Sequence, residues 1–395
     1  MNPWLKLLVC LLSASVCVRS ASAAPTVSNV TFAPRADGSR LVDVFYDLSD
    51  DWAGATSSIA LAVSSDGGAT YVVPVKSVTG AVGDGVTAGT GKRIVWDAGT
   101  DWPGQSSSQI KVQVRAWDLR HEGGYGFVRI PGGNYQIGNL MGDSDLSYAP
   151  VTSVMLSGFY LAAHQTTKAQ WDVVFSWATG NGYTFANAGA GKASHHPVQR
   201  VSWHDAVKWA NAASEKEGLT PCYRVGGQVY RTGNQDSVTC DWGANGYRLP
   251  TEAEWEVAAR GGLSGKRFPW GDTITHGQAN YYSSFTYSYD VSPTRGYHPT
   301  YATGNFPYTS PVGSFAANGY GLYDMAGNVF QWCWDVYGAY SGGSDPRGAA
   351  SGSWRVLRGG NWIMNEDYAR CAQRFISLPA GVSDYYGFRL ARGRP

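Results

Sequence analysis

The sequence has few charged residues and almost no excess of either sign. Lys, Arg, Asp and Glu make up 15% of its 395 residues, and the formal net charge is +1, whereas soluble proteins carry about 25% charged residues. A chain without a marked positive charge has little electrostatic attraction for nucleic acid or for an anionic membrane surface. We therefore expect no nucleic-acid partner.

Hydrophobic runs long enough to cross a bilayer are also absent. The apolar run Leu7–Val18 is too short for that role. It follows Lys6 and precedes an A-x-A sequence at Ala21–Ala23, which is typical of a signal peptide over residues 1–23. A lipoprotein signal is the alternative, but Cys17 is not followed by the small residue that such a signal needs. We expect a secreted or periplasmic protein with no integral membrane segment.

Cysteine is scarce, and four cysteines follow the predicted signal peptide: Cys222, Cys240, Cys333 and Cys371. An even number in an exported chain favours two disulfides, for which three pairings are possible. Cys222 and Cys240 bracket an apparent hairpin that turns at Gly226-Gly227. We expect the bridges Cys222–Cys240 and Cys333–Cys371, and the alternative is four reduced, buried thiols.

The first part of the chain, residues 24–119, contains neither histidine nor cysteine. Alternating apolar residues predict strands there, and signals such as Gly83-Asp84-Gly85 predict turns between them. The expected strands are Val27–Phe32, Leu41–Leu48, Ser58–Val63, Tyr71–Val75, Arg93–Trp96 and Ile110–Trp117. This spacing predicts an all-β, immunoglobulin-like sandwich. Without catalytic residue types, it is expected to be a spacer or adhesion module.

After a hinge at 120–124, residues 125–395 form a second predicted domain. It should begin with a hairpin, Tyr125–Ile137, that turns at Pro131-Gly132-Gly133, and a further strand is expected at Phe159–Leu161. Capping residues mark three helix starts, and Gly261-Gly262 ends the third helix. These caps are Thr167, Ser202 with Asp205, and Thr251 with Glu254; the first helix covers Thr166–Ala178 and the third runs to Arg260.

Glycine and aromatic residues are abundant where charge is scarce. The chain has 50 glycines, 16 tryptophans and 24 tyrosines, which predicts a loop-rich fold with an aromatic core. From Asp272 onward we expect little regular structure. The tyrosine-rich stretch Tyr281–Tyr308 predicts a long ordered loop, held by a metal or by ring stacking.

Seven motifs follow one another in the second domain. They are RLPTEAEWEVAARGG from Arg248, FPWGD from Phe268, PVGSF from Pro311, GYGLYDMAGNVFQW from Gly319, RVLRGGNW from Arg355, RCAQR from Arg370 and GFRLARG from Gly387. With them, the chain from Tyr125 to its end resembles the formylglycine-generating enzyme, or sulfatase-modifying factor, family. The resemblance implies an α+β chain: a β-sandwich followed by a loop-rich domain related to C-type lectins.

The enzymes of this family oxidise a sulfatase cysteine to formylglycine with two redox cysteines that bind copper. The resemblance places the first of them three residues after a Gly-Gly-Ser sequence. Here Asn361 replaces the serine and Met364 stands at the cysteine position, while Cys371 matches a structural cysteine. A thioether cannot become a thiolate, so copper is not expected. The alternative is an oxidase with a non-standard thiol site at Cys333 and Cys371.

Another branch of the family forms sulfur–carbon bonds with non-haem iron, which requires a histidine cluster. No histidine pair here has metal-ligand spacing on a convincing helix. The seven histidines are His121, His164, His195, His196, His204, His276 and His298. We therefore do not expect iron chemistry.

The resemblance implies structural calcium, which prefers oxygen ligands. The matching set for one ion is the Asp324 side chain, the carbonyls of Gly327 and Val329, and Gln331 in place of a glutamate. A second site would use Asn280, the Tyr281 carbonyl and groups near Asn305–Phe306, but Gly304 stands where a carboxylate is expected.

The leading hypothesis is a calcium-stabilised binding or accessory module that takes a polypeptide or a glycan. Six residues are expected to line its ligand groove: Asn361, Trp362, Asn365, Glu366, Asp367 and Tyr368. Tyrosine and tryptophan give rigid contact area at a low entropy cost. Arg370 and Arg374 are expected to form internal ion pairs with carboxylates such as Glu254 or Asp335.

Overall fold

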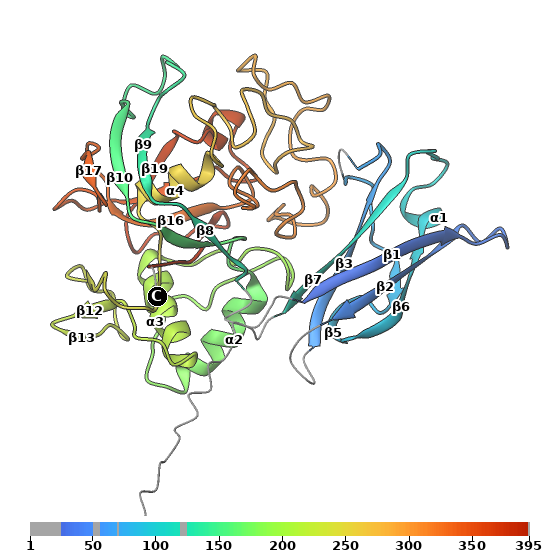
Figure 1. The fold of residues 1–395 in the computed structure, drawn as a ribbon, viewed down its shortest axis with the longest axis horizontal. Helices are drawn as coiled ribbons and strands as arrows, with labels where there is room; N and C mark the ends of the chain where they lie inside the picture. Colours follow the sequence, from blue (N-terminus) through green and yellow to red (C-terminus); the bar gives the residue numbers. More distant parts are fainter. Residues whose placement is uncertain (1–24, 50–55, 69–70, 119–124, 394–395) are drawn as a thin grey trace, which may run out of the picture.

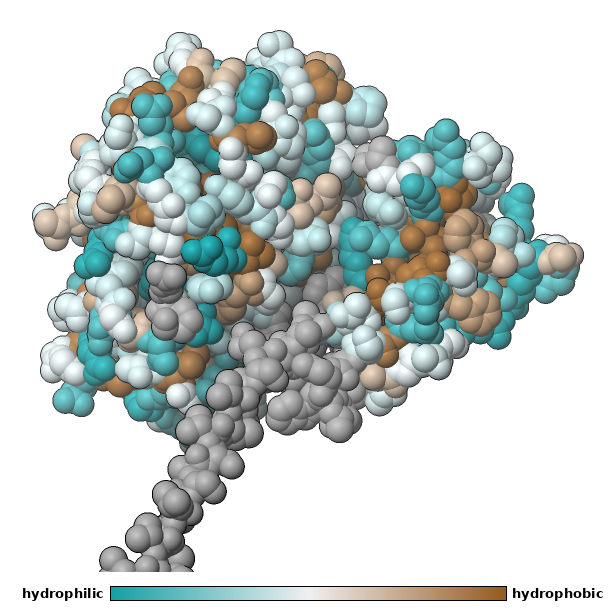
Figure 2. Space-filling view, viewed as in Figure 1, coloured by the Kyte–Doolittle hydropathy of each residue, from teal (hydrophilic) through white to brown (hydrophobic). Residues whose placement is uncertain are grey.

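A computed structural model describes residues 25–49, 56–68, 71–118 and 125–393. The predicted signal peptide and the 120–124 hinge lie outside these ranges. Figure 1 shows a smaller region, built of strands and the short helix α1, beside a larger region that contains helices α2–α4. On the face drawn in Figure 2, hydrophilic and hydrophobic residues are interspersed over the larger region, and a denser hydrophobic area lies on the smaller one. Within the described ranges, no helix combines the length and apolar character needed to cross a bilayer.

The smaller region consists of two antiparallel sheets that share one hydrophobic core. One sheet has the order β1 (Thr26–Pro34), β2 (Leu41–Ser49), β6 (Gly89–Asp97), β4 (Val78–Gly80), and the other β5 (Gly83–Thr87), β3 (Thr56–Ser64), β7 (Lys111–Asp118). A single helical turn, α1 (Ala98–Asp101), follows β6. Alternate residues of the strands, such as Val44, Val63 and Ile94, are fully buried between the sheets. This is the layered β-architecture that the period-2 pattern predicted.

Two details of this region differ from the prediction. Tyr71–Val75 is not a strand, since its pairing is limited to one bridge between Val73 and Val63. Gly83-Asp84-Gly85 was expected as a turn but begins strand β5. Both glycines have positive φ, +83° and +81°, and the β3–β5 register shifts beside them. A glycine-marked bulge on an edge strand was therefore mistaken for a turn.

The three helices of the larger region begin where the capping residues predicted. They are α2 (Lys168–Thr179), α3 (Trp203–Lys216) and α4 (Glu252–Ala259). Each start is a capping box, in which a hydroxyl accepts from the N3 backbone amide and the N3 side chain accepts from the cap amide. In α3, Ser202 and Asp205 form this pair.

Four small sheets complete the larger region. Their orders are β15–β21–β11–β8, β17–β10–β9, β19–β18–β16–β20 and β13–β12–β14. The strands are β8 (Phe127–Ile130), β9 (Gly133–Ile137), β10 (Thr152–Leu156), β11 (Phe159–Ala162), β12 (Tyr223–Val225), β13 (Gln228–Val229), β14 (Thr239–Cys240), β15 (Tyr247–Arg248), β16 (Phe330–Val336), β17 (Gly343–Ser344), β18 (Arg355–Arg358), β19 (Arg374–Ser377), β20 (Tyr386–Gly387) and β21 (Ala391–Arg392). The expected strand at Phe159–Leu161 and the turn at Gly226-Gly227 are confirmed.

Two predictions for this region are wrong. The expected Tyr125–Ile137 hairpin does not form, because β8 pairs with β11 and β9 pairs with β10. Gly132 instead lies where two chain segments meet, and a Cβ there would be 2.8 Å from the Gly158 nitrogen. The region after Asp272 is also more regular than expected, since β16, β18 and β19 form one sheet. Pairing between distant segments, not local propensity, creates these short strands.

The stretch Tyr281–Tyr308 contains no helix or named strand and is a long ordered loop, as predicted. Its side chains hold it together. The buried Asp290 carboxylate accepts from the hydroxyls of Tyr281 and Ser283, at 2.8 and 2.5 Å, and pairs with Arg295 at 3.1 Å.

The two regions contact each other through polar groups. Arg115 of β7 donates from Nη1 to the Gly313 carbonyl, and Thr300 Oγ1 donates to the Val72 carbonyl at 3.4 Å. The Gly313 amide in turn donates to Asp324 Oδ2 at 2.6 Å. Arg115 is therefore linked, through Gly313, to the loop on which calcium was expected.

Candidate functional site

The expected ligand groove follows strand β18 and two glycines. Gly359 and Gly360 have φ of +96° and +73°, and a Cβ on Gly360 would lie 2.9 Å from the Tyr368 backbone. Glycine is therefore required for the chain to turn back on itself before the 3₁₀ helix η2 (Glu366–Ala369).

Two of the six groove residues bind inside the protein instead of facing a ligand. Asn361 is buried, and its Oδ1 accepts from the amides of Ile363 and Met364, both at 2.9 Å. Glu366 is fully buried and accepts from the Ser284 amide and hydroxyl, at 3.0 and 2.7 Å. Because short polar side chains often stabilise turns in this way, sequence alone could not separate this role from ligand contact.

Trp362 is only 2% exposed, and its Nε1 donates to the Asp384 carbonyl at 3.2 Å. Three rings cover it: Phe306, Tyr308 and Tyr297, with centroid distances of 5.2, 5.6 and 5.9 Å. Phe306 is 57% exposed. We call the rings of Tyr282, Tyr297, Phe306 and Tyr308 the aromatic surface; Phe306 is exposed and the three tyrosines are half-buried. All four rings come from the long loop, and none was among the predicted groove residues. Trp362, which was predicted, packs beneath them.

The remaining groove residues are half-buried. Asn365 precedes η2 and bridges to Tyr282. Asp367 Oδ1 has no hydrogen-bond partner, and burial raises the pKa of this carboxyl. Tyr368 packs against Phe330 and Phe375.

The two nearby arginines form internal ion pairs, as expected, but with other partners. Arg370 pairs with Asp143 and Asp145, at 3.1 and 2.8 Å. Arg374 pairs with Glu252 at 2.7 Å. The predicted partners have other roles, since Glu254 pairs with Arg248 and Asp335 accepts from the Glu252 amide.

All four cysteines described in the structure are thiols, so neither expected bridge is formed in it. Cys222 and Cys240 are neighbours beside the β12–β14 pair, and a hydrogen bond from Cys240 lowers the pKa of Cys222. Cys333 and Cys371 are buried. Burial raises the pKa of Cys371 to about 12 and that of Cys333 well above its usual range. At neutral pH these two thiols stay protonated.

A known protein family matches the larger region of the structure. The sulfatase-modifying factor enzyme 1-like domain matches residues 119–394. The chain belongs to this family. The family domain therefore comprises the larger region of the structure, and the sandwich precedes it.

Curated relatives of the family domain carry several names. The formylglycine-generating enzyme of Thermomonospora curvata is 34% identical over 294 residues, which cover 67% of this chain and 93% of the enzyme. The chaperone protein LppX of Paenibacillus barcinonensis is 32% identical over 61% of this chain and 82% of its own length. The serine/threonine-protein kinase pkn1 of Chlamydia caviae is 34% identical, but the match spans 38% of the kinase.

Solved structures resemble the same part of the chain. Treponema denticola variable protein 1 matches with a TM-score of 0.54 and 28% identity, over 71% of this chain and 96% of that protein. CarF matches with a TM-score of 0.52 and 29% identity, over 68% of this chain and 98% of that protein. The family domain thus occurs in proteins with different names, and membership alone does not define its activity.

The family domain brings two carbonyls of the expected first calcium set together, whereas the Asp324 carboxylate, the expected side-chain ligand, accepts from the Gly313 amide at 2.6 Å. The carbonyls of Asp324, Gly327 and Val329 converge, but on the side-chain amide of Gln165, whose Nε2 lies 3.3, 3.3 and 3.0 Å from them. Gln331 Oε1 accepts from Trp255 Nε1, at 2.8 Å, and from an arginine. These oxygens already accept hydrogen bonds from donors, and this arrangement does not fit a calcium ion, which needs six to eight free oxygen ligands.

The second expected set does not fit calcium either. Asn280 Nδ2 donates to the Tyr308 carbonyl at 2.8 Å, and the Asn280 carbonyl accepts from the Asn328 amide at 2.8 Å. The Tyr281 carbonyl lies 3.2 Å from His276 Nε2. Asn280 Oδ1 is buried without a partner, but one oxygen is too few for a calcium site.

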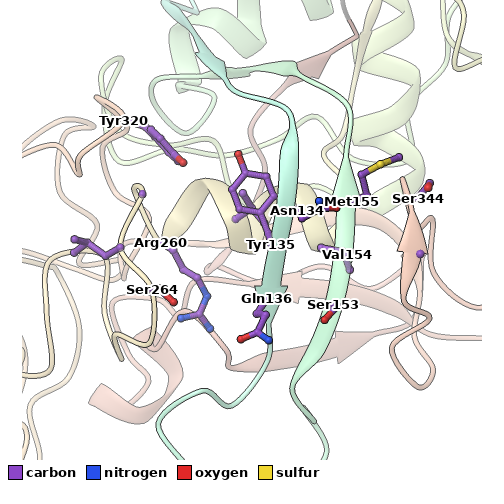
Figure 3. Close-up of a pocket in the computed structure, with 14 residues that line it drawn as sticks. Asn134, Tyr135, Gln136, Ser153, Val154, Met155, Arg260, Ser264, Tyr320 and Ser344 are labelled. Carbon is purple, nitrogen blue, oxygen red and sulfur yellow. The ribbon is translucent and has the colours of Figure 1, made fainter.

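A pocket of about 790 Å³ lies elsewhere on the family domain, between the sheet β17–β10–β9 and the end of α4. Figure 3 shows Tyr135 and Tyr320 on the same side of β9. The other polar residues on its wall are mostly neutral; they include Asn134, Gln136, Ser153, Ser264 and Ser344. The sequence analysis missed this pocket, because β9 was assigned to a hairpin with β8. The alternation of polar and apolar residues over Asn134–Ile137 was the available signal.

Proposed function

We propose that this chain is an exported binding module of its family and that it does not oxidise a substrate cysteine. The observation that carries the proposal is the surface above Trp362. At the place where the family resemblance expects a redox cysteine, Met364 is half-buried against the core. Nearby lies the aromatic surface, in which Phe306 is 57% exposed and the three tyrosines are half-buried.

The chemistry of the thiols supports the absence of oxidation. A cysteine that binds copper or attacks a substrate must be accessible and become a thiolate. Cys371 is 1% exposed, and burial raises its pKa to about 12. Cys333 is fully buried, and burial raises its pKa as well. The alternative, an oxidase that uses these two thiols, requires both residues to leave the core.

The aromatic surface supports binding of a polypeptide or glycan. Exposed tyrosine and phenylalanine rings provide contact area at a low entropy cost. The ring of Tyr297 lies 5.0 Å from Tyr282 and 5.9 Å from Phe306, so the rings form one continuous area. Lys192 Nζ lies 5.4 Å from the Tyr308 ring and adds one positive charge at its border.

The sandwich is proposed to be an immunoglobulin-like spacer or adhesion module. Its two sheets of four and three strands support this proposal. Export is proposed from the N-terminal sequence, in which Lys6, Leu7–Val18 and Ala21–Ala23 have the order of a signal peptide.

The oxidase alternative is tested by turnover. The mature protein is loaded with Cu(I) and incubated with oxygen and a peptide that contains Cys-x-Pro-x-Arg, and the peptide mass is followed. We expect an unchanged mass. A formylglycine mass shift that is lost in Cys371→Ser contradicts the proposal and identifies a non-standard thiol site.

Binding is tested with the same peptide, carrying serine for cysteine, and with a panel of neutral oligosaccharides. We expect one of these probes to bind, and Phe306→Ala to weaken binding at least tenfold, as loss of a central aromatic contact does. Phe45→Ala is the matched control, because Phe45 is a 40% exposed aromatic residue of the sandwich. Loss of binding in Tyr320→Ala but not in Phe306→Ala would move the binding site to the pocket near β9.

A further inference from the structure

The loop from Asp324 to Val329 turns its carbonyl groups inward. Asp324, Gly327 and Asn328 have positive φ, of +52°, +78° and +67°. A Cβ on Gly327 would lie 2.3 Å from the Asn280 carbonyl oxygen, so only glycine fits there. This backbone directs the carbonyls of Asp324, Gly327 and Val329 to one point, where a ligand with positive charge or hydrogen-bond donors must satisfy them.

In this chain a side-chain amide occupies that point. Gln165, just before helix α2, is fully buried. Its Nε2 donates to all three carbonyls at 3.0–3.3 Å. These are hydrogen-bond distances, whereas calcium binds oxygen at about 2.3–2.6 Å. An amide nitrogen carries two hydrogens, which the three carbonyls share.

A buried guanidinium supplies the positive charge. Arg389 is fully buried, and it donates to the carbonyls of Tyr323 and Asp324, at 2.7 and 3.2 Å, and to Gln331 Oε1 at 2.5 Å. It also donates to the carbonyl of Ala162, the last residue of β11, and to the carbonyl of Ala163. The Asp324 carboxylate is the acidic group whose charge acts on Arg389. The charge of this loop is therefore balanced without a divalent cation.

We propose that Gln165 and Arg389 together take the place of the calcium ion that the family resemblance implies at this loop. Of the oxygens in the expected set, the carbonyls of Gly327 and Val329 and Gln331 Oε1 already accept hydrogen bonds, as does the Asp324 carbonyl beside them. The Asp324 carboxylate accepts from the Gly313 amide through Oδ2, and among the residues that the structure describes its Oδ1 has no hydrogen-bond partner. The protein folds and keeps this loop in place in the absence of calcium.

The loop from Asp324 to Val329 also holds Trp362, on which the aromatic surface rests. The replacement of calcium therefore bears on ligand binding as well as on folding. The Trp362 amide donates to the Asn328 carbonyl at 3.0 Å, and the Gly327 amide donates to the Gly359 carbonyl at 2.7 Å. Asn328 Oδ1 also accepts from the Ser310 amide at 2.9 Å. The position of Trp362 therefore depends on the loop that Gln165 holds. This inference does not depend on the proposed function, since it concerns folding.

The first test is the thermal unfolding midpoint of the full mature chain in EDTA and in millimolar calcium. We expect the same midpoint in both, and less than one calcium per chain after gel filtration, measured by mass spectrometry of the metal. A midpoint that rises by several degrees in calcium, or one tightly bound calcium per chain, overturns the proposal, because a ligand that binds only the native state stabilises it.

The second test replaces the amide. Gln165→Leu keeps the volume but removes the donor, so its midpoint is expected to fall equally in EDTA and in calcium. Gln165→Glu places a carboxylate against three carbonyls, so its midpoint is expected to fall in EDTA and to recover in calcium. Gln136→Glu, at an exposed glutamine of β9, is the matched control. A Gln165→Leu variant as stable as the native chain overturns the proposal.

Discussion

The sandwich and the family domain bury different kinds of side chain. In the described part of the sandwich, the buried side chains are apolar apart from Ser57 and Ser64. Its ion pairs, such as Arg93–Asp43, lie at the surface. The family domain buries more than a dozen charged groups. A domain with long loops has fewer backbone ladders, and side-chain ion pairs hold its distant segments together.

Glu256 on α4 is the centre of this buried network. It pairs with Arg358 and Arg260, at 2.5 and 2.7 Å, and all three side chains are at most 6% exposed. Its Oε1 also accepts from the Gly138 amide at 2.7 Å, and its Oε2 from the Tyr340 hydroxyl at 3.1 Å. One carboxylate thus links α4 to strand β18 and to two loops.

The largest expected effect follows from removing this charge. Glu256→Gln keeps the shape of the side chain but removes the carboxylate that pairs with the buried guanidinium of Arg260, and leaves Arg358 with Glu252 at 3.7 Å in place of Glu256 at 2.5 Å. Loss of one partner of a buried pair costs about 3–5 kcal/mol. The loss of unfolding free energy is measured by urea denaturation, followed by the tryptophan fluorescence of the family domain. A loss of unfolding free energy below about 1 kcal/mol, the range of surface pairs, would mean that the buried ion pairs of the family domain stabilise it no more than the surface pairs stabilise the sandwich.

The pH dependence of stability should separate the two regions next. The sandwich sequence, residues 24–119, contains no histidine. In the family domain, burial lowers the pKa of His164, His196 and His298 to about 3 and that of His204 to about 4. A base with a lowered folded-state pKa binds fewer protons when folded, so stability is lost as pH falls from about 6.5.

Three carboxyls act in the opposite direction. Burial raises the pKa of Asp324 to about 6 and also raises the pKa of Asp335 and of Asp367, so protonation of these groups favours the folded state as pH falls. Each histidine shift, from 6.5 to about 3 or 4, is larger than the Asp324 shift from 3.8 to about 6. We expect the family domain to unfold at a higher pH than the sandwich in an acid titration. If the sandwich unfolds at the higher pH, this prediction is wrong.

How far the sequence predicted the structure also differs between the regions. In the sandwich, the alternation in Leu41–Leu48 and Arg93–Trp96 located β2 and β6, because period-2 burial is a local signal. In the family domain, capping residues located all three helix starts for the same reason. Strands β16, β18 and β19 were missed, because their pairing partners are far away in sequence.

The candidate site was predictable in part. The sequence identified the loop around Trp362 and the carbonyls of Gly327 and Val329. It did not identify Gln165, which is 159 to 164 residues away from the groups it bonds. Nor did it identify Phe306 as a cover for Trp362. Contacts of this kind come from the packing of the whole domain, which no local pattern encodes.

A smaller effect is expected at the contact between the regions. Arg115→Ala removes the hydrogen bond from the sandwich to the Gly313 carbonyl. A hydrogen bond to a charged group contributes about 1.5–3 kcal/mol, so the two unfolding transitions should move apart in denaturant. Lys111→Ala, at an exposed position of the same strand, is the control. If Arg115→Ala leaves the transitions unchanged, the regions are independent.

The smallest effect is expected from a surface ion pair of the sandwich. Asp43 accepts from Arg35 and Arg93, at 3.0 and 2.8 Å, and these partners lower its pKa to about 2. A depressed carboxyl pKa contributes stability that is present above about pH 4 and is lost only as pH falls through about 2. Because solvent screens a charge this close to the surface, Asp43→Asn should leave the unfolding midpoint at neutral pH within error. A loss comparable to that of Glu256→Gln would mean that burial does not determine which ion pairs hold this protein together.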